Sequence, residues 1–317
     1  MSMHTKGIHH ITAIVGKPQE NVDFYAGVLG LRLVKKTINF DDPGTYHLYF
    51  GDDQGSPGTI MTFFPWPNAM PGRIGGGQVG TTDFAIPPRT MDFWKKRLEK
   101  FDIDYEQVTR LGETHLAFTD PHGLQLTLVE QEHGRNNPWP FNGVSDIEAI
   151  KGFAGATLLS VNPNETAQLL EQTMGYEKMT EDDEWIRFTS KGDIGNIIDL
   201  KKENVGPGRM GVGMVHHIAF RAKDDDDQLE WQSHVADAGY QVTPVQDRQY
   251  FNAIYFREHG QILFEIATDP PGFAHDESYK TMGEQLKLPE WYEPKREQIE
   301  SQLHPAEVRT INHLNSD

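Results

Sequence analysis

The 317-residue sequence contains no cysteine, comparatively few basic residues and no long apolar run. Without cysteine, the chain has no disulfides, thiolate metal sites or cysteine nucleophiles, so any metal must be held by His, Asp or Glu. Lys and Arg together number 29 against 47 Asp and Glu, which gives a formal charge of −18. Because this charge repels phosphate backbones, we do not expect nucleic acid as a partner.

No apolar run approaches the roughly 20 residues that a membrane span needs, and residues 1–6 lack the apolar core of a signal peptide. We therefore expect no membrane partner and a cytoplasmic location. A hydrophobic fraction of 37% and a charged fraction of 24% are typical of a folded soluble protein. The length allows two domains. The sequence leaves the oligomeric state open, and a homo-oligomer is one alternative.

The string His-His-Ile occurs at residues 9–11 and again at 216–218, each time at the start of a predicted strand. Two copies so far apart indicate an internal repeat. The periodicity of apolar residues and the turn signals divide the chain into four units, each with one strand, one helix and three strands. The four units begin near Gly7, Gly77, Gly152 and Gly213.

One such unit cannot bury both faces of its sheet, so the units must pair into curved, barrel-like sheets around a shared cavity. We predict an α+β fold in which four βαβββ repeats form two domains. The predicted divisions are an N-terminal domain at 7–133, a linker at 134–150, a C-terminal domain at 151–272 and a tail with a helix at 273–317.

Each unit offers two inward positions, one at the head of its first strand and one in the middle of its last strand. Because side chains alternate along a strand, His10 is expected to face the cavity together with Thr12, while His9 and His216 face the opposite side. The pairs of inward positions are His10 and Thr62, Gly80 and Thr127, Gly155 and Asp199, and His217 and Glu265.

Two pairings of the units are open from the residues. If units one and four share a cavity, it gathers His10, His217 and Glu265, a set typical of non-haem iron(II) oxygenases, which leaves positions open for substrate and dioxygen. Thr62, the fourth position, is a poor ligand. If unit one pairs with two and unit three with four, Asp199 joins His217 and Glu265 instead. That set suits a glyoxalase-like lyase or isomerase with zinc or nickel.

The βαβββ repeat, with a histidine in its first strand and a carboxylate in its last, resembles the vicinal oxygen chelate superfamily, which has the glyoxalase fold. From His-His-Ile-Thr at 9–12 to Phe-Glu-Ile-Ala-Thr-Asp-Pro-Pro-Gly-Phe at 264–273, the chain is similar to ring-cleaving dioxygenases that act on hydroquinones and chlorohydroquinones. The resemblance implies that units one and four line one cavity and that His10, His217 and Glu265 bind iron(II). Manganese(II) accepts the same ligands and is the alternative.

The resemblance further implies an extradiol-type dioxygenase in aromatic catabolism or quinol detoxification, with a small aromatic compound and dioxygen as partners. Arg248 and Tyr255 match residues that line the substrate cavity of the family. Tyr255 shares the face of Glu265 if their strands are in register. Tyr255 is then expected to donate a proton to a ring oxygen, and Arg248 to hold a phenolate or superoxide by charge. Thr12 is a candidate for hydrogen bonding to the substrate.

The histidine that precedes the expected ligand in each His-His pair is harder to interpret. The resemblance implies that His216, as a catalytic residue, and His9, as a substrate-binding residue, act near the substrate, which unbroken strand alternation does not explain. A different class of function, a metal-free binding protein for aromatic compounds, also occurs on this fold. Loss of the His10, His217 and Glu265 set would favour that class, and the set is present in this sequence.

Overall fold

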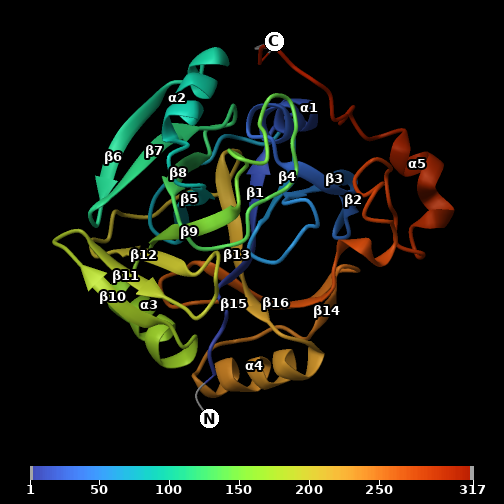
Figure 1. Cartoon of the computed structure of the whole chain (residues 1–317). Helices are drawn as coiled ribbons and strands as arrows, with labels where there is room; N and C mark the ends of the chain where they lie inside the picture. The colour runs from blue at the N-terminus through green and yellow to red at the C-terminus, as the bar shows by residue number, and fades with distance from the viewer. Residues whose placement is uncertain (1–2, 315–317) are drawn as a thin grey trace.

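The computed structural model describes residues 3–314 and contains two eight-stranded sheets (Figure 1). The first sheet runs, in spatial order, β14 (Gln246–Asp247), β15 (Phe251–Arg257), β16 (Leu263–Pro271), β13 (Met214–Ala222), β1 (Ile8–Val15), β4 (Ile60–Pro65), β3 (Asp42–Gly51) and β2 (Arg32–Asn39). The second sheet runs β10 (Glu177–Glu181), β11 (Trp185–Thr189), β12 (Ile197–Lys201), β9 (Gly152–Leu159), β5 (Gln78–Ile86), β8 (Gln125–Glu130), β7 (Glu113–Thr119) and β6 (Tyr105–Arg110).

Each sheet combines one unit from each half of the chain. The first sheet joins units one and four through the antiparallel pair β1 and β13, and the second joins units two and three through β5 and β9. The α+β fold of four βαβββ units is therefore confirmed, and so is the pairing of units one and four. The alternative pairing of unit one with two and unit three with four is wrong. The domain boundaries at 133 and 151 stay a prediction, because both sheets draw strands from both sides of the linker.

One helix follows the first strand of each unit. The helices are α1 (Pro18–Val22), which continues as the π-helix η1 (Asp23–Val28), α2 (Met91–Lys100), α3 (Pro163–Gln168), which continues as the π-helix η2 (Leu169–Thr173), and α4 (Asp225–Asp237). The acidic run at 224–227 caps α4, since the Asp224 carboxylate accepts a hydrogen bond from the Asp227 backbone N–H. Within residues 3–314, no helix has both the length and the apolar character to cross a membrane.

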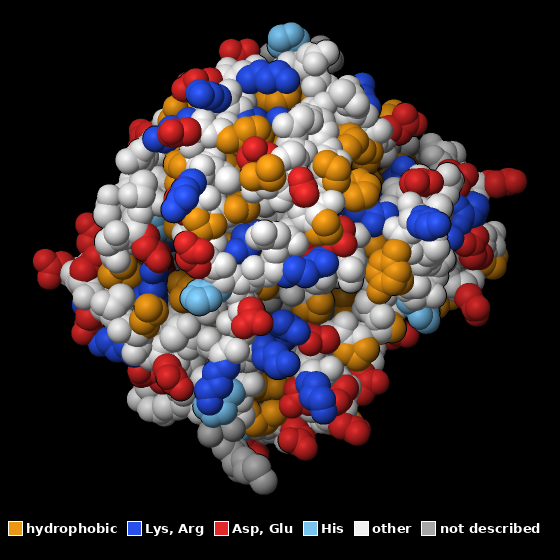
Figure 2. Space-filling model, viewed as in Figure 1, with side chains coloured by type: hydrophobic (Ala, Val, Ile, Leu, Met, Phe, Trp, Pro, Cys, Tyr) orange, Lys and Arg blue, Asp and Glu red, His pale blue; other side chains and the backbone are white. Residues whose placement is uncertain are grey.

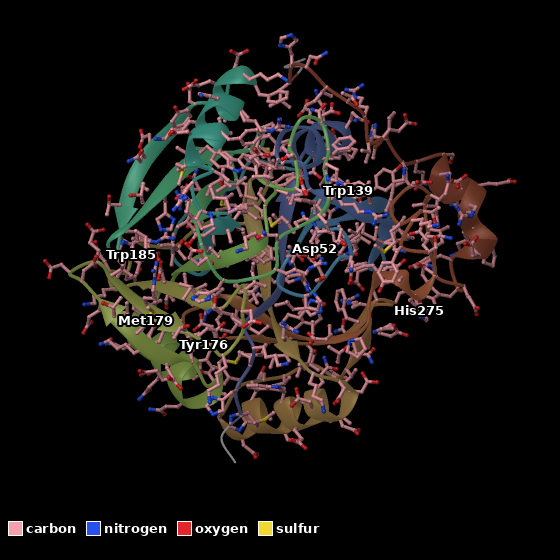
Figure 3. The ribbon with its side chains drawn as sticks, viewed as in Figure 1. Asp52, Trp139, Tyr176, Met179, Trp185 and His275 are labelled. Atoms are coloured by element: carbon pink, nitrogen blue, oxygen red, sulfur yellow. The ribbon has the colours of Figure 1, made fainter. Side chains whose placement is uncertain are left out.

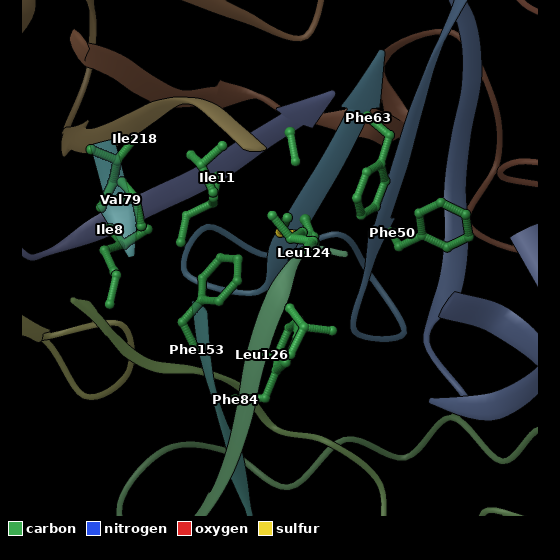
Figure 4. Packing of buried hydrophobic residues seen from close by; sticks show 14 of the residues in the cluster. Ile8, Ile11, Phe50, Phe63, Val79, Phe84, Leu124, Leu126, Phe153 and Ile218 are labelled. Atoms are coloured by element: carbon green, nitrogen blue, oxygen red, sulfur yellow. The ribbon is translucent and has the colours of Figure 1, made fainter. Parts of the chain in front are cut away.

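The hydrophobic core lies where the two sheets and their helices meet. Ile8 and Ile11 of the first sheet pack in the same buried cluster as Phe84 and Phe153 of the second, whose rings stack with centroids 5.5 Å apart (Figure 4). The cluster extends into the helices through Trp94 and other buried side chains. Because both sheets contribute to one core, each fixes the curvature and position of the other.

The two His-His pairs lie at β-bulges. The register of β1 against β13 passes from Ile8↔Phe220 to His10↔Ala219, and from Thr12↔His217 to Ala13↔Val215. His9 and His216 are therefore the extra residues of two bulges, where the alternation of side chains is interrupted. The expectation that His216 faces away from the cavity is wrong, since His216 lines it. The reason is the bulge, which interrupts the alternation of side chains.

The register also corrects one inward position. In unit one Thr12 lies beside Thr62, and in unit two Asp83 lies beside Thr127. Thr12 and Asp83 are therefore equivalent, and two residues before them lie His10 and Thr81. Thr81 is thus the counterpart of His10, and the predicted Gly80 is the counterpart of His9. β5 carries a bulge between Val79 and Thr82 at the position of the bulge at His9 in β1, and the sequence pattern did not show which residue of β5 is the extra one.

Two connecting segments run antiparallel to each other: the β4–β5 connection, which joins units one and two, and the β12–β13 connection, which joins units three and four. Arg73 and Arg209 exchange backbone hydrogen bonds of 2.8 Å in each direction, which joins the β4–β5 connection to the β12–β13 connection. The backbones approach so closely that a Cβ atom on Gly75 would lie 2.7 Å from the Gly208 nitrogen. Glycine at 75 thus serves this close contact.

The tail covers the β2 edge of the first sheet. Lys287 N donates to Lys36 O at 2.9 Å, and Ile38 packs with Leu288 and Ile299. The tail carries η3 (Phe273–His275), η4 (Glu293–Lys295) and the short helix α5 (Arg296–Glu300), which lies at the right edge of Figure 1. On the face that Figure 2 shows, acidic and basic side chains are interspersed, so the negative charge is not gathered there in one patch.

Candidate metal centre and aromatic cavity

The central strands of the first sheet bring three predicted ligands together. His10 of β1, His217 of β13 and Glu265 of β16 each offer one ligand atom, and these atoms lie within 4.8 Å of one another. His217 Nε2 lies 2.9 Å from Glu265 Oε2, and His10 Nε2 lies 3.3 Å from the same oxygen. All three side chains are buried.

The surroundings of Glu265 fit a bound metal ion. The carboxylate is fully buried, and within residues 3–314 neither of its oxygens accepts a directional hydrogen bond. Burial opposes ionisation, but the two imidazoles outweigh it and hold the pKa of Glu265 well below its ordinary value. Burial lowers the pKa of His217. Metal ligation requires an ionised carboxylate and a neutral imidazole. A buried ionised carboxylate also needs a cation to offset the cost of its burial.

The histidine that precedes each ligand fixes the orientation of the ligand ring. His9 Nδ1 lies 2.9 Å from His10 Nδ1, and His216 Nδ1 lies 2.8 Å from His217 Nδ1. If the ligand ring donates from Nδ1, its Nε2 is left with a lone pair for a metal. Burial lowers the pKa of His9, and burial lowers that of His216 to about 3, so both rings are neutral acceptors.

A cavity of about 540 Å³ opens beside these side chains. His10, His216 and His217 lie in its wall, whereas Glu265 is behind the histidines. Six of the fourteen other lining residues are aromatic, which suits a flat apolar ring with a few polar groups. The aromatic lining residues are Phe40, Tyr49, Phe64, Trp66, Phe251 and Tyr255.

Tyr255 and Arg248, both predicted from the sequence, line this cavity side by side. Tyr255 lies directly opposite Glu265 in the β15–β16 pair, as the predicted register required. Arg248 Nε donates to the Tyr255 hydroxyl oxygen at 3.2 Å. Burial raises the pKa of Tyr255 well above its ordinary value, so the phenol stays protonated at neutral pH. Because its oxygen already accepts from Arg248, its own O–H is free to donate into the cavity.

Two further predicted residues lie away from the cavity wall. The Thr12 hydroxyl is buried and pairs with the Thr62 hydroxyl at 2.9 Å. His9 lines a separate polar pocket of about 220 Å³ with Tyr250 and Asp269. Both residues thus lie next to the ligand set on its inner side, and the structure does not bring them into the wall of the aromatic cavity.

The sequence interpretation missed His47 and Tyr49 of β3. His47 lines the cavity, and its ring bonds to the Thr62 hydroxyl at 2.8 Å through Nε2 and to the Tyr49 hydroxyl at 2.7 Å through Nδ1. Tyr49 lies opposite Thr62 just as Tyr255 lies opposite Glu265. Aligning the third strands of units one and four would have identified Tyr49.

Asp199, the ligand of the alternative pairing, lies in the second sheet. Arg187 Nε donates to Asp199 Oδ1 at 2.7 Å, and Arg110 Nε donates to Oδ2 at 2.8 Å. Arg110 also pairs with Asp83, and its guanidinium lies 5.7 Å from the ring of Trp185, which Figure 3 labels. Asp199 is therefore structural and does not reach the ligand set.

Comparisons with known proteins agree with this geometry. Residues 7–274 match the Glyoxalase/Bleomycin resistance protein/Dioxygenase superfamily. MhqO from Bacillus subtilis, provisionally named a ring-cleaving dioxygenase, is 63% identical over 312 residues, which cover 98% of this chain and 100% of MhqO. Chlorohydroquinone/hydroquinone 1,2-dioxygenase from Sphingobium indicum is 33% identical over 319 residues, which cover 97% of this chain and 96% of that protein.

Solved structures give the same result for the fold. The crystal structure of a provisionally named dioxygenase from Bacillus subtilis has a TM-score of 0.97 at 63% identity, covering 98% of this chain and 100% of that one. Glyoxalase I from Zea mays has a TM-score of 0.61 at 12% identity, covering 83% and 92%, and shares the fold alone. The chain therefore belongs to the glyoxalase/bleomycin resistance protein/dioxygenase superfamily and, within it, to the group of proteins that includes MhqO.

Proposed function

We propose that this protein is an iron(II)-dependent ring-cleaving dioxygenase of the extradiol type that acts on hydroquinone-like aromatics. In this proposal His10, His217 and Glu265 hold the metal, and manganese(II) is the alternative ion because it takes the same ligands. The relatives named for ring cleavage, and the one named for hydroquinone and chlorohydroquinone, support the reaction class and the substrate class.

One observation carries the proposal. A fully buried carboxylate, Glu265, lacks a directional hydrogen bond within the described residues, and two imidazole nitrogens face it beside an aromatic cavity. Leaving such a carboxylate without a cation is costly. A divalent ion bound there would offset that cost and supply the redox chemistry that joins dioxygen to a phenolic ring.

The protein's own residues would bind the ring and manage its protons. The aromatic wall excludes water and stacks on the ring, which orients a ring hydroxyl toward the ligand set. Tyr255 keeps its proton at neutral pH because burial raises its pKa, so it can donate to a ring oxygen as negative charge develops. Arg248 holds the phenol of Tyr255 in place through its Nε–H.

His216 would serve as a neutral partner of the substrate. If His217 holds the metal through Nε2, its Nδ1–H donates to His216 Nδ1, which leaves the proton of the neutral His216 ring on Nε2. A neutral imidazole in the cavity wall can donate from Nε2 or receive the proton of a ring hydroxyl in turn. In this proposal Thr12 and His9 act from behind the ligands, by bonding to Thr62 and to His10, and not by contact with the ring.

We further propose that the aromatic substrate and dioxygen are its working partners, that it acts in catabolism or detoxification of quinols, and that it works in the cytoplasm. The test is dioxygen consumption by anaerobically iron-loaded protein with hydroquinone, methylhydroquinone and catechol, alongside its metal content. We expect the wild-type protein to consume dioxygen with the two hydroquinones. His217→Ala should lose both its metal and this consumption, whereas His259→Ala, whose imidazole is exposed, should keep both.

Two outcomes would contradict the proposal. If the loaded wild-type protein consumed no dioxygen with any of the three rings, a glyoxalase-like reaction would gain support, and if it took up no metal, a metal-free binding protein would. Equal metal content in His217→Ala and wild type would remove the ligand set itself from the proposal.

A further inference from the structure

The mouth of the aromatic cavity carries an ion pair between units one and four. Asp41 lies in the turn between β2 and β3, and Arg248 lies just before β15. Arg248 Nη1 donates to Asp41 Oδ2 at 3.1 Å, and the two residues are 207 positions apart in the chain. The pair thus bridges the two units whose inner faces form the cavity.

Each nitrogen of the Arg248 guanidinium already has an acceptor. Besides the bond to Asp41, Nη2 donates to Gln246 Oε1 at 2.6 Å and Nε donates to the Tyr255 hydroxyl at 3.2 Å. A guanidinium binds an entering anion best when two adjacent N–H groups are free to form a bidentate contact. Three of the five N–H groups of Arg248, one on each nitrogen, are therefore already engaged, so an entering anion must compete with these bonds.

The rest of the wall offers an anion no compensation. Arg248 is the one Lys or Arg among the described residues that line the cavity. The second mouth carboxylate, Asp42, accepts from Trp66 Nε1 at 2.8 Å and from Thr45 Oγ1 at 3.0 Å, so its negative charge is fixed beside the opening. An anionic substituent would therefore lose its hydration and meet two carboxylates.

We propose that Asp41 is a specificity-determining residue that restricts the cavity to rings without an acidic substituent, because it neutralises and occupies Arg248. This inference rests on the proposed function and deepens it by naming the substrate class as uncharged quinols. The attraction between Asp41 and Arg248 keeps the one nearby cation from binding an acidic ring, and the carboxylates add repulsion against it.

The test compares two rings of similar shape and different charge, methylhydroquinone and 2,5-dihydroxybenzenesulfonate. The sulfonate is chosen because it is a weak metal ligand, so its binding reports on the mouth and not on the metal. In Asp41→Asn we expect the ratio of kcat/KM for the sulfonate to that for methylhydroquinone to rise about fivefold over wild type, the upper end for an ion pair with an exposed carboxylate. Calorimetry under anaerobic conditions should show the same shift in the ratio of the two Kd values.

Asp42→Asn is the matched control, since it removes one mouth charge without releasing Arg248. We expect its ratio to change by less than about twofold, because Arg248 stays paired with Asp41 and only the screened repulsion of Asp42 is lost. Equal gains in both variants, or no gain in Asp41→Asn while wild type cleaves methylhydroquinone, would overturn this inference and leave the proposed function intact. If wild type neither bound nor cleaved methylhydroquinone, both would fail.

Discussion

The two sheets place a carboxylate at the same position of their C-terminal unit. Glu265 lies beside Ala219 in the first sheet, and Asp199 lies beside Thr157 in the second. Asp199 is bonded by two buried arginines, whereas the imidazoles of His10 and His217 lie against Glu265. The difference teaches that one architecture can either neutralise its central carboxylate with its own cations or leave it for a cation from solution.

The residue opposite each carboxylate decides between these outcomes. Arg187 lies opposite Asp199, and Tyr255 lies opposite Glu265. The heads of the first strands differ as well, because His217 of the first sheet corresponds to Gly155 of the second. A Cβ atom on Gly155 would lie 2.3 Å from the Ile197 carbonyl oxygen, so the second sheet has no room for an imidazole there.

The largest expected effect comes from removing the charge of Glu265. We expect Glu265→Gln to abolish metal retention and dioxygen uptake, because an amide cannot replace an anionic ligand. The metal-free variant should unfold within about 1 kcal/mol of the metal-free wild type, because no fixed cation is left unpaired. Metal analysis and urea denaturation of both proteins measure this. A variant that kept its metal would show that Glu265 is not a ligand.

Tyr255→Arg would place an arginine opposite the central carboxylate of the first sheet, as Arg187 lies opposite Asp199 in the second. An arginine opposite Glu265 would supply an internal cation to the carboxylate, so we expect metal affinity to fall more than about 100-fold, beyond the loss typical of altered metal-site neighbours. Tyr255→Phe is the control, with unchanged metal content and dioxygen uptake reduced about 100-fold, the loss expected for a general acid. Titration of apoprotein with iron(II) distinguishes the two, and full metal affinity in Tyr255→Arg would contradict the comparison.

Much of the fold could be predicted because the repeat has strong local signals. The units predicted to begin near Gly7, Gly77, Gly152 and Gly213 do begin there, with β1, β5, β9 and β13. The repeat alone left two candidate ligand sets open. The family resemblance favoured His10, His217 and Glu265, and the pairing of β1 with β13 brings the two strands that carry His10 and His217 side by side.

What the sequence could not provide is long-range register. The bulges at His9 and His216 arise from the pairing of β1 with β13, which no local pattern encodes, and they explain why His216 reaches the cavity. The contact of Asp41 with Arg248 and the bond of Arg110 to Asp199 depend in the same way on which units pair. Side chains that meet across a sheet become visible only when its strand order is known.

A smaller effect is expected from the mirror-image change in the second sheet. Asp199→Ala leaves Arg110 and Arg187 buried without their shared partner, so we expect a loss of about 3–5 kcal/mol in unfolding free energy, as for a broken buried ion pair. Metal content of the folded protein should not change. Asp183→Ala, at an exposed position of the same unit, is the control and should cost less than about 0.5 kcal/mol. A loss of metal in Asp199→Ala would revive the alternative ligand set.

The smallest effect concerns the fourth position of each sheet, Thr62 in the first and Thr127 in the second. Among residues 3–314 the Thr62 hydroxyl bonds to two neutral groups, Thr12 and His47, whereas the Thr127 hydroxyl donates to the Asp83 carboxylate at 2.7 Å. Since bonds to charged groups are stronger, Thr62→Val should cost about 1 kcal/mol of unfolding free energy and Thr127→Val about 2 kcal/mol. Neither change should alter metal affinity, because the proposed site uses three ligands and leaves Thr62 outside the set. Paired urea denaturation and iron titration measure both quantities, and weaker iron binding in Thr62→Val alone would make Thr62 part of the centre.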